Sequence, residues 1–296
     1  MKSTTLLGVI LLSLTWGCGP LEESAQPSGE PGGMVQPLED DNGLAFNGLA
    51  FNGLAFNGLV FNGLAFNGLN SSSFSSWFKQ RPAQSNLFMK YLVRCAVPAG
   101  QTRTYSDGTA TYVWSGHLGL APAWSNGSPA TLAEQRIVSA CLAALVNKYG
   151  RSVLLSLLGT NAQGQPIPST ASELSDFPLR EGCFFGNLFN GEGLFVGNDQ
   201  GLLSPSQSSL RACAIEGANA CPPLVHIGSC HSICTHDSTG TYFTQCTYQG
   251  ITYRPITTRI RPQDIYTCGD GICQSTESCG NGSSASSCNR DCGSCR

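Results

Sequence analysis

Cysteine is the residue type that most constrains the fold of this chain. The sequence of 296 residues has 15 cysteines, and one of them, Cys18, follows an N-terminal apolar segment. The other 14 form an even set: Cys95, Cys141, Cys183, Cys213, Cys221, Cys230, Cys234, Cys246, Cys268, Cys273, Cys279, Cys288, Cys292 and Cys295. Behind an export signal, so many thiols indicate a disulfide framework. The spacing alone leaves its connectivity open.

The N-terminus has the features of an export signal. Lys2 precedes an apolar run at residues 6–14, and Gly17 stands directly before Cys18. The run is far shorter than the roughly 20 residues of a membrane-spanning helix, so residues 1–17 are predicted to be a signal peptide. Gly17-Cys18 resembles a bacterial lipoprotein signal, which implies a lipid on Cys18 and an outer-membrane lipoprotein whose lipid anchor is its contact with the membrane. Ordinary cleavage and release into the extracellular medium is the alternative.

Two low-complexity segments follow the signal. Residues 18–41 are rich in proline, glycine and acidic residues, which predicts a disordered tether. Residues 42–70 repeat the phrase Asn-Gly-Leu-Ala-Phe, in which each Asn-Gly favours a turn. The phrase resembles pentapeptide repeats, which implies a square β-helix. A low-complexity stalk and a self-associating β segment are the alternatives.

Residues 77–263 are predicted to form one α+β body with its own core. Apolar residues at helical spacing indicate a helix at residues 85–95. A second helix, at residues 131–150, begins with a capping box of Thr131 and Glu134. Two helices of this kind, each with one apolar face, are expected to pack against each other.

Cys95 and Cys141 lie on the apolar sides of these two helices, which predicts a disulfide between them. Ser106, Asp107 and Gly108 separate two short β-like runs and indicate a hairpin. Further strand signals occur at residues 153–158, 184–189, 194–196, 242–248 and 251–260. Helical and β-rich parts therefore follow one another in series, which favours an α+β fold over an α/β fold.

Four phrases of the body carry a family resemblance. They are Tyr-Leu-Val-Arg-Cys at 91–95, Leu-Gly-Leu-Ala-Pro-Ala-Trp at 118–124, Val-Ser-Ala-Cys-Leu at 138–142 and Glu-Gly-Cys-Phe-Phe-Gly-Asn-Leu-Phe at 181–189. The body resembles uncharacterised exported, cysteine-rich, lipoprotein-like proteins of myxobacteria. This resemblance implies an exported lifestyle and supplies no catalytic residues.

Charge and motifs argue against several classes of function. A net charge of -3 and a sequence pI of about 5.8 disfavour binding to nucleic acid. The sequence has no Gly-x-Ser-x-Gly elbow, His-Glu-x-x-His helix, phosphate loop or dinucleotide fingerprint. His117, in a Gly-His-Leu-Gly segment, could act as a general base, but the sequence indicates no Ser or Asp partner for it. No catalytic residue is assigned, and the sequence leans away from an enzyme.

The densest group of metal-ligating residue types lies between residues 226 and 237. His226, Cys230, Cys234 and His236 could hold zinc as a four-ligand set, with Asp237 supporting one of the ligands. Disulfides are the competing use of Cys230 and Cys234, and the even number of cysteines agrees with either use. The sequence favours disulfides here.

The tail at residues 268–296 has six cysteines in fewer than 30 residues, so disulfides must define its fold. It resembles the small Cys-Gly-Asp-Gly-x-Cys modules of exported bacterial proteins and, distantly, calcium-dependent Notch-type repeats. Asp270, Glu277 and Asp291 offer the oxygen ligands that calcium prefers. A disulfide-bonded knot with solvated acidic residues and no bound metal is the alternative.

Together these features predict an exported cell-surface protein with a structural or binding role, no obligatory cofactor, and a protein or cell-surface partner. An exported metal-dependent hydrolase that uses the residues from His226 to Asp237 is one alternative. A calcium-dependent adhesin that acts through the tail is another.

Overall fold

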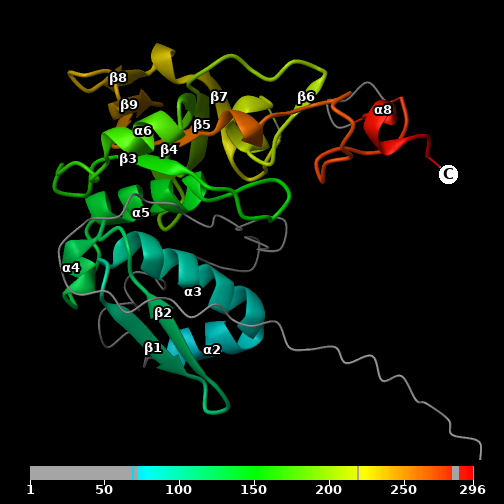
Figure 1. Cartoon of the computed structure of the whole chain (residues 1–296). Coiled ribbons are helices and arrows are strands. Elements are labelled where there is room, and N and C mark those ends of the chain that lie inside the picture. Colours follow the sequence, from blue (N-terminus) through cyan, green and yellow to red (C-terminus); the bar gives the residue numbers. More distant parts are fainter. Residues whose placement is uncertain (1–68, 70–71, 219, 282–286, 296) are drawn as a thin grey trace, which may run out of the picture. The chain divides into compact units, whose positions relative to one another are not determined.

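The computed structural model describes residue 69 and residues 72–218, 220–281 and 287–295 (Figure 1). The predicted signal peptide, the predicted lipidation site at Cys18, the predicted tether and all of the pentapeptide repeat except Leu69 lie outside these residues. Within the described part, seven α-helices and four β-sheets form a mixed α+β structure, as the sequence predicted.

The first described elements are two helices and a hairpin. Helix α2 (Ser72–Gln80) is followed by α3 (Pro82–Ala96), which starts with a proline in its first turn, where no backbone donor is needed. Strands β1 (Thr102–Ser106) and β2 (Thr111–Ser115) pair in antiparallel register and confirm the predicted hairpin. Gly108 has a φ of +94° in the turn, which glycine adopts without strain.

Aromatic rings join this hairpin to α2. The Phe78 side chain is fully buried, and its ring centroid lies 4.8 Å from that of Tyr105 and 4.7 Å from that of Tyr112. Phe74 meets Tyr105 edge to face at 4.8 Å, and Trp114 donates from its indole Nε1 to Asn86 at 2.7 Å. Buried aromatic contacts therefore fix the hairpin on the helices.

After the short helix α4 (Pro122–Ser125), helix α5 (Leu132–Ala144) has the capping box that the sequence predicted. The Thr131 hydroxyl accepts from the backbone N–H of Glu134, and the Glu134 carboxylate accepts from the backbone N–H groups of Thr131 and Ala123. The helix ends at Ala144, whereas the sequence predicted an end near residue 150.

A buried arginine from a distant segment accounts for this earlier end. The Arg211 guanidinium donates to the carbonyls of Ala144 and Val146, and so satisfies acceptors that a longer helix would have used internally. The same guanidinium forms a fully buried ion pair with Glu181, with Nε 2.9 Å from Oε1. Burial raises the pKa of Glu181, and the contact with Arg211 acts in the opposite direction.

The central sheet has five strands in the order β3-β11-β4-β5-β7. Its strands are β3 (Ser156–Gly159), β4 (Leu179–Asn187), β5 (Gly193–Asn198), β7 (Val225–Ser229) and β11 (Ile256–Ile260). All neighbours are antiparallel except β5 and β7, which run parallel. The predicted strands at residues 153–158, 184–189 and 194–196 thus correspond to β3, β4 and β5, with shifted ends.

Both faces of this sheet are covered. Helix α5 packs on one face, against β4, β5 and β11, and Phe184 belongs to the core on that side (Figure 1). On the other side, Phe185 and Phe195 pack with Phe243 and Tyr253 in a second, smaller core. Because both faces are covered, almost all consecutive residues of β4 are buried, and buried and exposed residues do not alternate along the strand.

A second sheet of three strands contributes to the smaller core. Its order is β10-β9-β8, with β8 (Cys234–His236), β9 (Phe243–Tyr248) and β10 (Ile251–Tyr253). The predicted hairpin turn at Gln249 and Gly250 joins β9 to β10, and both residues have positive φ. The rest of the predicted second strand forms β11 of the central sheet, because the chain changes sheets at Arg254 and Pro255.

Short elements link these sheets. They are α6 (Ala171–Asp176), β6 (Gln207–Ser208), α7 (Ala212–Ile215), the 3-10 turns η4 (Cys230–Ser232) and η5 (Pro262–Asp264), β12 (Tyr266–Thr267) and α8 (Asn289–Cys292). Strand β12 pairs with β6, and the Ser208 hydroxyl lies 2.8 Å from that of Thr276. These contacts join the cysteine-rich tail to the body.

Seven disulfides pair all 14 cysteines outside the signal region. Cys95–Cys141 connects α3 to α5 and confirms the predicted bridge. The other pairs are Cys183–Cys230, Cys213–Cys221, Cys234–Cys246, Cys268–Cys288, Cys273–Cys292 and Cys279–Cys295. So many bridges fit an exported protein in an oxidising compartment. In the described part of the chain, no helix combines the length and the apolar character needed to span a bilayer.

Candidate functional site

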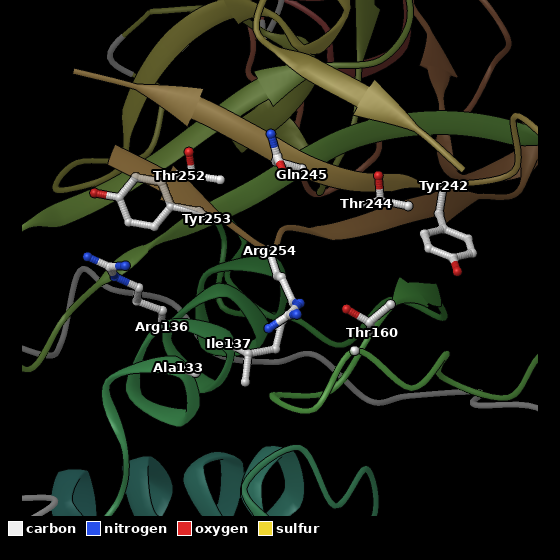
Figure 2. A pocket seen from close by; sticks show the side chains of 11 residues that line it. Ala133, Arg136, Ile137, Thr160, Tyr242, Thr244, Gln245, Thr252, Tyr253 and Arg254 are labelled. Carbon is white, nitrogen blue, oxygen red and sulfur yellow. The ribbon is translucent and has the colours of Figure 1, made fainter. Parts of the chain in front are cut away.

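A polar pocket of about 530 Å³ lies where α5, the segment after β3 and the β9–β10 hairpin meet (Figure 2). Its lining comprises Ala133, Arg136, Ile137, Thr160, Gly164, Tyr242, Thr244, Gln245, Thr252, Tyr253 and Arg254. Helix α5 supplies its apolar floor through Ala133 and Ile137, and the hairpin supplies hydroxyl and amide groups. The volume is within the usual range for small-molecule sites.

Arg136 and Tyr253 form one side of this pocket, and the positive charge of Arg136 is neutralised by Glu192. Arg136 donates to both carboxylate oxygens of Glu192, at 3.0 Å from Nε and 2.8 Å from Nη2. Burial acts to raise the pKa of Glu192, but hydrogen bonds from Arg136 and Asn190 outweigh it and lower the pKa. Burial and the Glu192 charge raise the pKa of Tyr253 to about 12, so its phenol is neutral at physiological pH.

Arg254 is different, because no described carboxylate lies within ion-pair distance of its guanidinium. It is an exposed side chain that extends into the space above α5 in Figure 2. Its Nη1 donates to the carbonyl of Ala162 at 3.0 Å, which holds the guanidinium in place. A Cβ built on Gly164 would come within 3.3 Å of Nη2, so the glycine leaves room for this position. The remaining donors of Arg254 are available to a ligand.

Hydroxyl groups occupy the rest of the wall. The Thr160 hydroxyl is buried and has no hydrogen-bond partner among the described residues. The Thr252 hydroxyl is 3.2 Å from that of Thr247, and the Thr244 hydroxyl donates to the carbonyl of Thr235 at 3.1 Å. Each can still accept a hydrogen bond from a ligand. Sequence reasoning missed this pocket, because its residues come from segments that are far apart in the chain.

The four residues predicted as zinc ligands are used differently in the structure. Cys230 is bonded to Cys183 and Cys234 to Cys246, so neither thiol is available for metal. The His226 imidazole Nε2 lies 3.0 Å from the carbonyl of Ala214. Of these four residues, only His236 belongs to a cluster of potential ligand atoms that contains no disulfide sulfur. Asp199 and His231 are the other members of this cluster.

The two disulfides of this region lie side by side. The sulfurs of Cys183 and Cys234 are 3.6 Å apart, and the backbone N–H of Cys183 donates to the Cys230 sulfur at 3.1 Å. A Cβ on Gly197 of β5 would meet the Cys230 sulfur at 3.0 Å and the Cys183 sulfur at 3.1 Å, so this bridge crosses the sheet closely at the glycine. The paired disulfides fix η4 and β8 against the central sheet.

Asp237, predicted to support a zinc ligand, instead organises the turn that follows β8. Its carboxylate accepts from the backbone N–H groups of Thr239, Thr241 and Tyr242 and from the Thr239 hydroxyl. Partial burial acts to raise the pKa of Asp237, but these hydrogen bonds outweigh it and lower the pKa to about 2. The group is therefore a charged acceptor within a loop.

His117, the predicted general-base candidate, borders another cavity, of about 660 Å³, between α3 and β2. Its imidazole Nε2 is buried without a hydrogen-bond partner among the described residues. Burial, and secondarily the charge of Arg94, lowers the pKa of His117. No described hydroxyl or carboxylate is hydrogen-bonded to this nitrogen, so Nε2 has no nucleophile to activate there.

The three acidic residues predicted to bind calcium stabilise turns of the tail. Asp291 accepts from the backbone N–H groups of Gly269 and Gly271, at 2.6 and 3.0 Å. Asp270 accepts from the backbone N–H of Ile272 and from the side chain of Gln274, and Glu277 accepts from the backbone N–H of Gln274. Oxygens of Glu277 and Asp291 lie within 4.8 Å of each other, in a group that does not include Asp270.

Comparison with known proteins found no matching family model, no matching curated protein and no matching solved structure.

Proposed function

We propose that this chain is an exported binding protein of the cell envelope that holds a small, hydroxylated molecule carrying one carboxylate in the pocket of Figure 2. One observation carries the proposal: Arg254 presents a guanidinium, fixed by the Ala162 carbonyl, with no described carboxylate within ion-pair distance. A ligand carboxylate would supply the missing anion.

The charges of the pocket support an anionic ligand. Arg136 is neutralised by Glu192, so the positive charge of Arg254 is the unbalanced one among the lining residues. Guanidinium groups bind carboxylates through two parallel hydrogen bonds, which fixes orientation as well as charge. The donors of Arg254 that do not contact Ala162 can form such a pair.

The remaining lining supports a hydroxylated ligand. Thr160 lies beside the Arg254 guanidinium, and Thr244, Thr252, Gln245 and Tyr253 line the same pocket farther from it (Figure 2). A polyol needs several alternating donors and acceptors, and an aromatic ring packs well against its C–H face. Acidic sugars, such as hexuronates, have both the hydroxyls and the single carboxylate that this lining would recognise.

The direct test compares one acidic sugar with its neutral counterpart. Titration calorimetry with D-glucuronate and D-glucose should show glucuronate binding more tightly by about tenfold or more, since a charge-assisted hydrogen bond is worth about 1.5–3 kcal/mol. Arg254→Gln should remove this preference. Arg81→Gln, which changes an exposed arginine outside the pocket, should leave it intact.

Equal binding of the two sugars, absence of binding by both, or the same loss in the Arg254→Gln and Arg81→Gln variants would contradict the proposal. Because Arg254 is exposed, its substitution should leave the melting temperature almost unchanged. A loss of binding therefore reports on the pocket and not on folding.

The location in the cell envelope rests on Gly17-Cys18 and the seven disulfides. A lipid on Cys18 would tether the protein, since each buried methylene contributes about 0.8 kcal/mol. Mass spectrometry of the N-terminal peptide from the producing cell should show acyl chains on Cys18. An unmodified N-terminus, or one that begins at another residue, would contradict lipid anchoring and indicate that the protein is released.

A further inference from the structure

Three potential ligand side chains converge at one edge of the central sheet, outside the pocket of Figure 2. Asp199 directly follows β5, His231 lies in η4 directly after β7, and His236 ends β8. Because β5 and β7 run parallel, with Asn198 opposite Ser229, their carboxyl ends meet at the same edge. The topology therefore brings Asp199 and His231 together although the sequence separates them.

The two disulfides hold the histidines in place. Cys183–Cys230 fixes the residue before His231, and Cys234–Cys246 fixes the strand that ends at His236. The His236 ring also stacks on Phe243, with centroids 4.0 Å apart and an interplanar angle of 29°. Side chains immobilised in this way lose little further freedom when they bind a ligand.

The distances suit a shared ion. One ligand atom from each of the three residues lies within 4.8 Å of the others. His231 Nε2 is 3.0 Å from Asp199 Oδ1, whereas His236 Nε2 is 3.4 Å from the other ring nitrogen of His231, Nδ1, so one of these two contacts opens when a single His231 nitrogen binds the ion. Ligands at about 2.0–2.2 Å from one zinc ion are about 3.3–3.6 Å apart in tetrahedral geometry. Small side-chain rotations would bring all three atoms into that range.

Several of these polar atoms lack hydrogen bonds. The Asp199 side chain is 1% exposed, and although His231 Nε2 lies 3.0 Å from Oδ1, neither oxygen accepts a hydrogen bond of normal geometry from the described residues. Nδ1 of His236 is also buried without a hydrogen-bond partner among them. The nearest guanidinium atom, Nη1 of Arg180, is 3.9 Å from Oδ1. A buried carboxylate is costly unless it is paired and fully hydrogen-bonded, and the contacts with His231 and Arg180 leave Asp199 with unused acceptor positions for a cation.

We propose that Asp199, His231 and His236 form a binding site for a divalent first-row transition-metal ion such as Zn²⁺. Two imidazoles and one carboxylate are a donor set that suits zinc, iron, cobalt and nickel, whereas calcium and magnesium prefer oxygen donors alone. The cysteines beside the site contribute no thiolate, because they are in disulfides. The His231 side chain is 52% exposed, so solvent or a second ligand can reach the remaining coordination positions.

The test uses the full chain with its disulfides intact, a tag without histidine, and prior removal of metal by EDTA. Calorimetric titration with Zn²⁺ should show one ion per chain, and Co²⁺ should give visible absorption bands of a nitrogen- and oxygen-ligated ion. His231→Gln and His236→Gln should each weaken Zn²⁺ binding by about 100-fold or more, because loss of a direct ligand costs at least as much as loss of a supporting group.

The matched control is His226→Gln, a nearby histidine whose ring contacts the Ala214 carbonyl and takes no part in the cluster. It should bind Zn²⁺ like the unchanged protein. Because His231 is half exposed, His231→Gln should fold normally, which melting in EDTA would verify. A rise in melting temperature on adding Zn²⁺ should occur in His226→Gln and be lost in His231→Gln.

Absence of stoichiometric Zn²⁺ binding would overturn the proposal. So would binding that survives both His231→Gln and His236→Gln, or that falls equally in His226→Gln. Titration of the unchanged protein and the His231→Gln variant with D-glucuronate should give the same affinity, since the pocket of Figure 2 does not include these residues. The experiments can therefore contradict the metal-site proposal and the sugar-site proposal independently of each other.

Discussion

The helical part of the molecule, residues 72–146, and the cysteine-rich tail, residues 268–295, are stabilised in different ways. The helical part has one disulfide and a large buried core that includes Phe78, Leu92 and Ile137. The tail has three disulfides, and Thr276 and Cys288 are its only buried residues among those described. Covalent bridges thus replace a core where the chain is too short to form one.

The largest expected difference between the two parts appears when their disulfides are reduced. Under a mild reductant, backbone amides of the tail should lose their protection from hydrogen exchange, since little apolar burial would hold them. Amides of α3 and α5 should stay protected under the same conditions. Exchange measured by mass spectrometry, with and without the reductant, checks this difference. A tail that stays protected after reduction would contradict it.

Removing a core aromatic should destabilise the helical part more than any single change at the tail surface. Phe78→Ala deletes a fully buried ring that contacts Tyr105 and Tyr112, and the expected loss is about 3–5 kcal/mol. Ile272→Ala changes a tail residue that is 63% exposed, and should cost less than about 0.5 kcal/mol. Urea unfolding of both variants measures the difference, and equal losses would show that the tail has a core of its own.

Loss of the single bridge in the helical part should be tolerated. The double substitution Cys95→Ala with Cys141→Ala removes the link between α3 and α5 and should cost about 2–4 kcal/mol. Far-ultraviolet circular dichroism should still show the native helix content, because the core around this bridge remains. Unfolding of the helical part at room temperature would instead show that the bridge, and not the core, holds the helices together.

A smaller effect is expected at the start of α5. Thr131→Ala removes the hydroxyl that accepts from the backbone N–H of Glu134, and should cost about 1 kcal/mol. Thr131→Ser keeps the acceptor and should restore most of the stability. Chemical denaturation of the two variants makes the comparison, and an equal loss in both would mean that the hydroxyl is not the stabilising group.

The smallest expected effect concerns pH in the β1–β2 hairpin. Hydrogen bonds from Thr109 and Ala110 hold the pKa of Asp107 well below its usual range. A lowered folded-state pKa gives stability that is present above the unfolded value, near 3.9, and is lost as the pH falls further. The melting temperature of Asp107→Asn should therefore be below that of the unchanged protein at pH 7 and approach it at pH 2. A constant difference would contradict this.

Local signals in the sequence predicted what local physics decides. The capping box at Thr131, the Asp107-Gly108 turn and the Gln249-Gly250 turn each lie within a few residues, and the structure has all three. The Cys95–Cys141 bridge was also predictable, because helical spacing places both cysteines on apolar faces. The early end of α5 was not predictable, because it depends on Arg211 from a distant segment.

The two candidate sites could not be predicted from the sequence for the same reason. Asp199 and His231 meet only because β5 and β7 are parallel neighbours, and no spacing rule in the sequence contains that pairing. Arg254 reaches its pocket only because the chain leaves the small sheet for the central one at that point. The pattern in the sequence predicts His236 as a zinc ligand, but the cysteines predicted beside it form disulfides in the structure.

Disulfides, and not metal-bound thiolates, organise the region around His236. The most direct measurement is a peptide mass map of the protein from its producing cell, prepared without reduction. We expect Cys183–Cys230 and Cys234–Cys246 as linked peptides, with no alkylated thiol among the 14 cysteines that follow Cys18. If Cys230 and Cys234 were instead found free and alkylated, the disulfide assignment would be wrong, and both cysteines would again be candidate zinc ligands.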